Sequence, residues 1–349
     1  ADPAEKAKAI VKLSTVEFSA GRYSDALALL KEHAHVFDER VSHSLRGSFH
    51  NHLALVLKQL GILEARPDYL DRAIIEYTAA IHHLGEAGHD RYRATNENNL
   101  ANLLRKMGRY RQAHEHLERA GAVLRRLNDA GLLAQVDETR ASVFIAEKKY
   151  GEAERVISRA VRTLEQGGAA ALLADALTTQ GVTWARLGKN ENSIQVLRRA
   201  VQVAEEAGAF SNAGLAALTL IEEHGARRTF PRQELYELYE RADNLLKDAQ
   251  HPETIARLRV CARVVMRRLA GIQLDDRNFT FFNAVQEFEE RLIERALEEA
   301  GGSVVRAARL LGPKHQTFTS MLTQRHKKLL AKRTPREKRL RSIIKEPKE

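Results

Sequence analysis

The sequence predicts an all-α protein in which an array of helical hairpins precedes a small, basic helical unit. Three observations carry this prediction. No proline lies between Pro67 and Pro231, in a stretch rich in Ala, Leu, Glu and Arg, and proline inside a helix costs a hydrogen bond and about 3 kcal/mol. Small residues recur every 40 positions in the same stretch, and the positive charge of the chain gathers at its C-terminal end.

The composition is that of a folded chain that does not enter a membrane. Hydrophobic residues make up 44% and charged residues 29% of the 349 residues, and no apolar run approaches the roughly 20 residues that span a bilayer. The first helix predicted is amphipathic and charged, unlike a secretory signal. The one cysteine, Cys261, cannot form an internal disulfide and indicates a reducing compartment. We therefore expect a cytoplasmic protein with no membrane partner.

The charge is distributed unevenly. Residues 303–349 hold 14 Lys or Arg and 3 Asp or Glu, a net charge of +11, whereas the whole chain carries +10, which leaves −1 for the first 302 residues. Such an end indicates a polyanion partner. A solvated tail without specific contacts is the alternative interpretation.

The repeat is seen most clearly in its small residues. Ala73, Ala113, Ala153 and Ser193 are spaced by 40, and an alanine follows each of them seven residues later, at Ala80, Ala120, Ala160 and Ala200. Ala101, Ala141 and Gly181 precede the last three by twelve residues. Small residues at these spacings let two antiparallel helices approach closely. An earlier copy begins at Gly21, and seven extra residues separate it from the next, near residues 66–68.

These residues resemble the tetratricopeptide repeat (TPR). The likeness lies in Leu100-Ala101 of a first helix, the turn with Gly108 and Tyr110, and Ala113 and Ala120 of a second helix. The period of 40 exceeds the about 34 residues of most such repeats. Similar long repeats occur in kinesin light chain and in bacterial sensors of TPR type. The resemblance implies a superhelix whose concave groove is lined by the first helix of each pair.

The repeat register places polar residues in that groove. Asparagine has both donors and acceptors, so it pairs well with an extended peptide backbone. The groove candidates are Asn51, Thr95, Asn98, Asn102, Arg105, Lys106, Glu138 and Ser142. We expect them to bind a peptide or protein ligand. The alternative is the hydrated polar face of a scaffold.

The histidines and the sequence motifs indicate neither a metal site nor a catalytic site. The chain has 14 histidines, several of them in His-x-His pairs such as His114 and His116. Side chains two apart on a helix point about 200° from each other, so such a pair cannot share one metal ion. We interpret these pairs as surface residues. No nucleophile–base pattern, glycine-rich phosphate loop or metalloprotease motif is present. We therefore expect no enzyme, no metal and no cofactor.

Further helices are predicted after the repeats, over residues 231–248 and 254–270, with a linker over 271–278. The next predicted helix, residues 282–300, has an apolar face and an acidic face and stops at Gly301-Gly302, a helix C-terminal signal. Ser303 can then cap a short helix with Ala307 and Ala308 facing inward, Gly312 permits a tight turn, and a second helix follows over residues 314–328. Two short helices joined by a turn with Gly form the helix-turn-helix pattern.

Residues 290–322 resemble the Fis-type helix-turn-helix at the C-terminus of bacterial enhancer-binding regulators. The likeness lies in the Glu-rich helix, Gly-Gly-Ser, Val-Arg-Ala-Ala-Arg-Leu-Leu-Gly and Gln-Thr-Phe. It implies that the second helix enters the DNA major groove and that the preceding helices form a homodimer. It also implies DNA contacts from Lys314, His315, Gln316, Thr317 and Ser320. The chain departs from the family at His315, Ser320 and Met321, where basic residues are common, and at Pro313, where Ile is common.

Basic residues follow the second helix instead, and we interpret them as an arm that contacts phosphates or a minor groove. The full set of DNA-binding candidates is Ser303, Lys314, His315, Gln316, Thr317, Ser320, Gln324, Arg325, Lys327, Lys328, Arg333 and Arg336.

We expect a TPR-like array over residues 4–248, a connecting helix and linker over 249–281, a Fis-type helix-turn-helix domain over 282–331 and a basic tail over 332–349. The function predicted is a transcriptional regulator that binds double-stranded DNA and whose array senses a peptide, a protein or another ligand. The alternative is a protein-interaction scaffold whose tail binds nucleic acid non-specifically.

Overall fold

The computed structural model describes residues 2–227, 230–249, 251–270 and 281–332, and these residues form helices without any strand. The predicted all-α fold is thereby confirmed. The chain divides into two compact units, Ala1–Gly271 and Ile272–Glu349, and each is described by itself. No helix of the described residues is long and apolar enough to cross a membrane.

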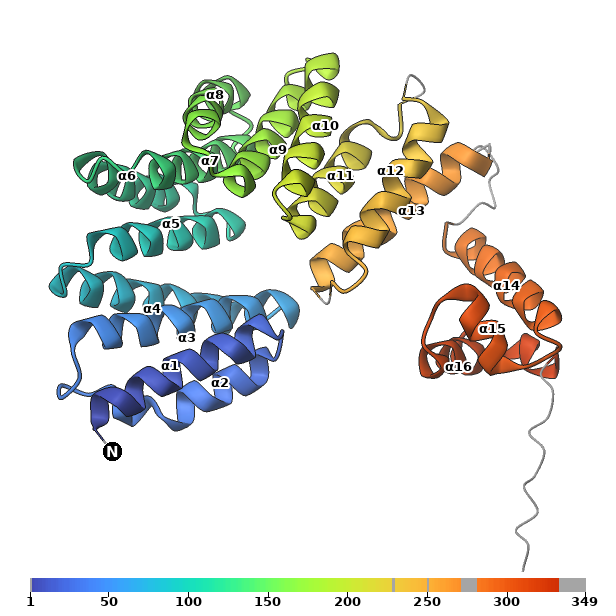
Figure 1. Ribbon diagram of the computed structural model, residues 1–349, viewed down its shortest axis with the longest axis horizontal. Helices are drawn as coiled ribbons and strands as arrows, with labels where there is room; N and C mark the ends of the chain where they lie inside the picture. Colours follow the sequence, from blue (N-terminus) through green and yellow to red (C-terminus); the bar gives the residue numbers. More distant parts are fainter. Residues whose placement is uncertain (1, 228–229, 250, 271–280, 333–349) are drawn as a thin grey trace, which may run out of the picture. The chain divides into compact units, whose positions relative to one another are not determined.

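The first unit is a stack of antiparallel helix pairs (Figure 1). The pairs are α1 (Pro3–Ser19) with α2 (Tyr23–Glu32), α3 (His43–Leu63) with α4 (Pro67–Glu86), α5 (Asp90–Lys106) with α6 (Tyr110–Arg126), α7 (Ala130–Ala146) with α8 (Tyr150–Gly167), α9 (Ala170–Arg186) with α10 (Asn190–Glu206), and α11 (Phe210–His224) with α12 (Arg232–Leu245). A 3₁₀ helix, η1 (Ala34–Val36), follows α2, and α13 (Pro252–Ala270) packs against α11 and α12. The helix pairs therefore continue beyond residue 210, where the sequence repeat fades.

The turns of this unit repeat every 20 residues in the same backbone conformation. A residue with positive φ stands at Gly88, Gly108, Asn128, Lys148, Gly168, Gly188 and Gly208. Glycine suits this conformation because it has no Cβ to clash with the carbonyl oxygen that follows. Lys148, with φ of 62°, adopts this conformation at a cost in conformational energy, because its side chain has a Cβ.

The small residues at the repeat positions lie where helices cross, as the spacing predicts. Ala73, Ala113 and Ala153 are completely buried. At Gly181 an added Cβ would lie 2.4 Å from Cγ of Leu197, whose side chain is also fully buried. The close approach of α9 and α10 therefore depends on the missing side chain.

Ser193 takes the alanine position of the fourth copy, and the structure shows why a hydroxyl is tolerated there. Its Oγ donates to the carbonyl oxygen of Gly181 at 2.7 Å and lies 2.8 Å from Nε2 of His224. Since the single hydroxyl proton goes to the carbonyl, Nε2 of His224 carries the proton of this second bond. Nδ1 of the same ring is buried without a hydrogen-bond partner. Burial accordingly lowers the pKa of His224 to about 4.

The histidines are less exposed than the sequence suggested. The surface interpretation concerns the His-x-His pairs and does not hold for two other histidines. His224 is fully buried and His326 is 2% exposed. The pairs behave differently from each other: His116 Nδ1 contacts Glu97 at 2.5 Å, whereas His35 is exposed. No group of three or more His, Cys, Asp or Glu within the described ranges is arranged to hold a metal ion.

The second unit contains α14 (Phe281–Glu299), α15 (Val304–Leu311), α16 (His315–Gln324) and a 3₁₀ helix, η2 (Lys327–Lys332). As predicted, Ser303 caps α15 and accepts a hydrogen bond from the Arg306 amide, and Gly312 ends that helix with φ of 88°. The core of the unit consists of Ile293, Ala296, Leu297, Ala300, Ala307, Ala308, Phe318, Leu322 and Leu329. This is a helix-turn-helix fold with α14 packed beneath it.

Two predicted segments differ from the structure or lie outside it. The second helix of the motif ends at Gln324 and not at Lys328, because the buried His326 turns the chain back toward α14, where its Nε2 lies 3.2 Å from Oε2 of Glu289. Lys327 and Lys328 therefore belong to η2. The predicted linker at 271–278 lies outside the described residues.

Candidate DNA-binding surface and polar groove

The exposed face of α16 is polar. Gln316, Ser320 and Gln324 are spaced by four residues, and Thr317 adjoins them, so the four share one side of the helix. Gln316, Thr317 and Gln324 are exposed and Ser320 is half-buried. The opposite side holds α16 to the unit through Phe318 and Leu322, which are fully buried. The helix thus presents a row of hydrogen-bonding side chains, the groups that read base edges in a major groove.

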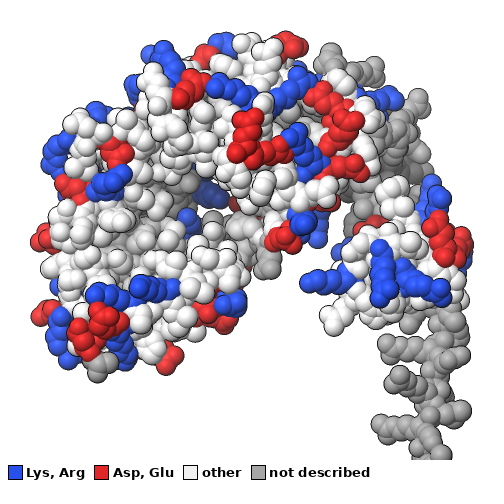
Figure 2. All heavy atoms as spheres, in the orientation of Figure 1, with Lys and Arg blue, Asp and Glu red and all other residues white. Residues whose placement is uncertain are grey.

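Positive charge surrounds this row. Figure 2 shows Lys and Arg side chains gathered over α15 and α16 of the second unit. Lys314 and His315, at the start of α16, are exposed, as are Lys327 and Lys328 of η2. Neither Lys327 nor Lys328 forms an ion pair with any residue that the structure describes. Their charge is free to act on a phosphate backbone.

Other predicted basic residues are engaged or not described. Arg325 Nη1 lies 3.8 Å from Oε1 of Glu289. Lys332 bonds to two carboxylates of α14, with Nζ 2.5 Å from Glu294 Oε1 and 2.7 Å from Glu298 Oε1. Arg333 and Arg336 lie outside the described residues. The acidic face of α14 therefore holds part of the basic segment.

Sequence reasoning missed two exposed arginines beside this surface. Arg306 and Arg309 lie on α15, within the Val-Arg-Ala-Ala-Arg segment that identified the motif. The signal was their spacing of three from each other and from the cap Ser303, which turns both away from the buried Ala307 and Ala308. Ser303 itself is half-buried and serves the helix cap.

The polar groove lies in the first unit. Figure 2 shows a hollow there, bordered by α3 to α5 on one side and by α9 to α13 on the other. The register places Asn51 of α3 and Asn98 of α5 at equivalent positions. Asn98 is 7% exposed, and the amide oxygens of both residues are buried without a hydrogen-bond partner in the structure. Unpaired buried amide oxygens are unusual because they have lost hydrogen bonds to water without gaining others.

The remaining groove candidates form two local networks. Arg105 donates to Oδ1 of Asn102 from Nη2 at 2.9 Å. Glu138 Oε1 accepts from Thr179 at 2.7 Å and from Ser142 at 3.2 Å, and burial raises the pKa of its carboxyl. Thr95 is the exception among the candidates, because its hydroxyl bonds to the carbonyl oxygen of Arg91 in its own helix.

Basic side chains meet at the ends of α3 and α5. Lys106 Nζ lies 3.2 Å from Oε2 of Glu253, the second residue of α13. Burial, and to a lesser degree the nearby charge of Lys106, lowers the pKa of Lys58 in α3 to about 8. Sequence reasoning missed Lys58. The signal was available, because Lys58 precedes Arg105 by the same 47 residues that separate Asn51 from Asn98.

Comparison with solved structures defines the class of the first unit. Aspartyl phosphate phosphatase F from Bacillus subtilis has 16% sequence identity and a TM-score of 0.55 over 90% of this chain and 78% of that chain. A Rap protein complexed with competence and sporulation factor has 14% identity and a TM-score of 0.52 over 95% of this chain and all of that chain. A signal-transduction ATPase with a tetratricopeptide repeat sensor from Pyrococcus horikoshii has 11% identity and a TM-score of 0.50 over 91% of this chain and 49% of that chain. The likeness establishes a TPR-like helical-repeat fold.

The second unit has a family assignment of its own. Residues 284–318 match the model of the bacterial regulatory protein family, Fis type. The protein is therefore a TPR-like repeat protein with a Fis-family helix-turn-helix at its C-terminal end. No curated protein sequence matches the chain.

Proposed function

We propose that the chain is a DNA-binding transcriptional regulator whose TPR-like array binds a peptide or protein ligand. The observation that carries the proposal is the row of Gln316, Thr317, Ser320 and Gln324 on the exposed side of a Fis-family second helix. Lys314, Lys327 and Lys328 supply phosphate contacts that fix the position of this helix, while the row reads sequence.

The proposed division of labour follows the predicted domains. Residues 4–248 form the sensing array, 249–281 connect it, 282–331 bind DNA and 332–349 add positive charge. A Fis-type helix-turn-helix and a helical-repeat sensor both point to a regulator that carries out no catalysis. We propose a cytoplasmic location, which fits a DNA-binding regulator of the Fis type.

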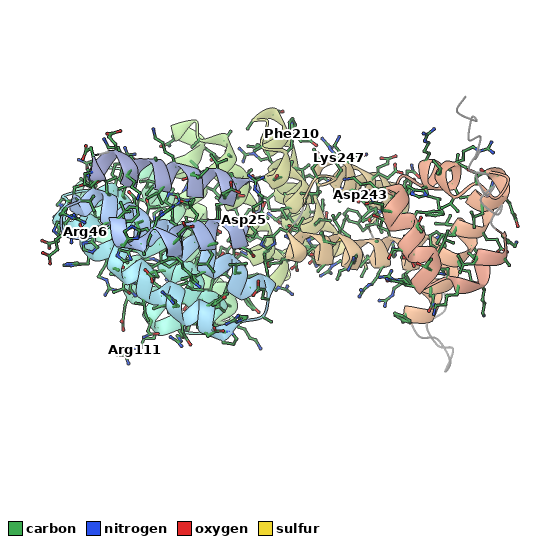
Figure 3. All side chains as sticks on the ribbon, turned by 90° about the horizontal axis from the view of Figure 1, so that it is seen from below. Asp25, Arg46, Arg111, Phe210, Asp243 and Lys247 are labelled. Carbon is green, nitrogen blue, oxygen red and sulfur yellow. The ribbon has the colours of Figure 1, made fainter. Side chains whose placement is uncertain are left out.

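We also propose that the protein binds DNA as a homodimer through α14. Phe288 and Leu292 of this helix are 48% and 41% exposed, and Val285 stands three residues before Phe288 on the same side. An exposed apolar stripe of this kind marks an association surface. Sedimentation of Phe288→Ser should give a lighter species than the native chain. Phe210→Ser is the matched control, because Phe210 is 57% exposed at the start of α11, at the surface of the first unit (Figure 3).

The deciding experiment is selection of random duplex DNA by the full chain at about 0.15 M salt, a concentration that weakens purely electrostatic binding. A regulator enriches an inverted repeat. The double variant Gln316→Ala with Thr317→Ala should lose the sequence preference, because each side-chain contact to a base edge is worth about 1–3 kcal/mol. A matched control is Gln112→Ala with Thr78→Ala, two exposed residues of the array.

Retention without an enriched site would refute sequence-specific regulation and favour the scaffold with a non-specific basic tail. Binding by the array is supported by the unpaired amide oxygens of Asn51 and Asn98, which accept from donors such as the N–H groups of an extended backbone. The ligand of one structural neighbour, competence and sporulation factor, belongs to that neighbour and identifies no ligand for this chain.

A further inference from the structure

Helix α13 contacts helices that precede it by about 150 to 200 residues. Lys106, the last residue of α5, forms its ion pair with Glu253 at 3.2 Å, and Oε1 of Gln59 in α3 lies 3.4 Å from Nε2 of His251. Figure 1 shows α13 beginning beside the ends of α3 and α5. These two contacts join the beginning of the last helix of the first unit to α3 and α5.

The lysines at this point outnumber their counterions. Lys58 Nζ forms neither a hydrogen bond nor an ion pair within the described part of the chain, and its side chain is largely buried. The charged neighbour that acts on it is Lys106, which repels it. A largely buried ammonium without a counterion is unfavourable because it has lost water without gaining a partner. The carboxylate of Glu253 also remains in contact with water, because its side chain is 55% exposed.

The unpaired groups of the groove lie on the same helices. Asn51 precedes Lys58 by seven residues, and Asn98 precedes Lys106 by eight, so each amide is two turns from a lysine on the same side of its helix. Amide oxygens without a donor match the N–H groups of a peptide, and lysines without a full complement of counterions match a carboxylate of the same peptide.

We propose that a carboxylate of a peptide ligand binds Lys58 and Lys106 and displaces Glu253, which releases α13 from α5. Glu253 thus acts as an internal competitor that occupies Lys106 in the unliganded protein. This inference rests on the proposed sensing function of the array. Because α13 is the last described helix before the DNA-binding unit, its release gives ligand binding a direct effect on the segment that leads to that unit.

The test uses the full chain and two pools of random octapeptides, one with free C-terminal carboxylates and one with C-terminal amides. Peptides retained by the protein are identified by mass spectrometry. We expect Lys58→Met to reduce retention by about 30-fold or more, as the loss of one buried charged partner does. Lys31→Met, an exposed lysine of α2, is the matched control and should retain peptides normally.

Glu253→Gln should act in the opposite direction and increase retention, because the internal competitor is removed. Lys58 dependence in the free-acid pool alone assigns the carboxylate to the peptide C-terminus, and dependence in both pools assigns it to Asp or Glu side chains. Thermal unfolding of each variant shows that the array remains folded. Hydrogen exchange of residues 253–258, the N-terminal turns of α13, should rise when selected peptides bind, and should already be raised in Glu253→Gln, whereas the part of the helix that packs against α11 and α12 should stay protected.

Equal retention by Lys58→Met and the native chain would overturn the lysine site while leaving peptide sensing intact. Binding without a rise in exchange over residues 253–258 would overturn the displacement of Glu253. If the native chain and every variant retain no peptide from either pool, both the site and peptide sensing fall, whereas DNA selection tests the helix-turn-helix independently.

Discussion

Replacement of Phe318 by alanine should unfold the DNA-binding unit and leave the array intact. Phe318 is completely buried and is the largest side chain in the core of the second unit. Its partner in holding α16 is Leu322, also fully buried. Truncation of a buried Phe to Ala costs about 3–5 kcal/mol, through lost transfer energy and the cavity left behind.

That cost is comparable with the whole stability of a unit this small. A core in a domain of fewer than about 70 residues rarely supplies more than about 3–5 kcal/mol. We therefore expect a large fraction of Phe318→Ala molecules to lose the fold of α15 and α16. The array has separate hydrophobic clusters, of which one is built around Leu57, Leu100 and Leu117 and shares no residue with the second unit.

Hydrogen exchange of the full chain separates the two units in one measurement. Protection over residues 304–332 should collapse, and protection over residues 94–204 should stay unchanged. Phe210→Ala removes the same atoms from a 57% exposed position and should change stability by less than about 0.5 kcal/mol. Normal protection over residues 304–332 in Phe318→Ala would refute the core described here, as would an equal loss in both units.

Three further predictions concern the array and the DNA contacts. Gly181→Ala should destabilise the array by about 1–3 kcal/mol in urea unfolding, because the new Cβ overlaps the buried Leu197; unchanged stability would mean that α9 and α10 do not approach as described. His224 has a folded-state pKa lowered to about 4. Between about pH 6.5 and pH 4 its ring is therefore protonated in the unfolded chain but not in the folded one, so the free energy of unfolding should fall as the pH drops through this range. His224→Gln should flatten that pH dependence, and an identical profile would contradict the buried neutral ring. Lys327→Met and Lys328→Met should each reduce the slope of log K against log salt for DNA binding by about 0.9, and a slope equal to that of the native chain would show that η2 does not touch phosphates.

Much of the fold was predictable because close packing leaves a local signature. The small residues at Ala113, Ala153 and Ala120 mark helix crossings, and the helix-turn-helix follows from Ser303 and Gly312, which act on their immediate neighbours. The end of α16 was not predictable in this way. It is set by His326, whose burial depends on Glu289, a residue 37 positions away that no local pattern connects to it.

The groove shows the same limit. The register predicts Asn98 and Glu138 as groove residues, because equivalent positions recur along the repeat. It could not supply Glu253, which reaches Lys106 only because the array curves until α13 meets α5. Contacts that arise from the summed curvature of many helix pairs occur at no regular sequence spacing, so a repeat pattern cannot predict them.

The regular turns have a consequence for how such an array changes in length. Because Asn128 and Gly168, which lie in turns that join one helix pair to the next, both have positive φ and are 40 residues apart, a segment such as residues 130–169 begins and ends at equivalent points of the superhelix. Its deletion or duplication rejoins a second helix to a first helix through a turn of the same shape. Recombination within the gene in steps of forty codons can therefore lengthen or shorten the groove in whole helix pairs, and so alter the size of ligand that it holds, without any new joint having to evolve.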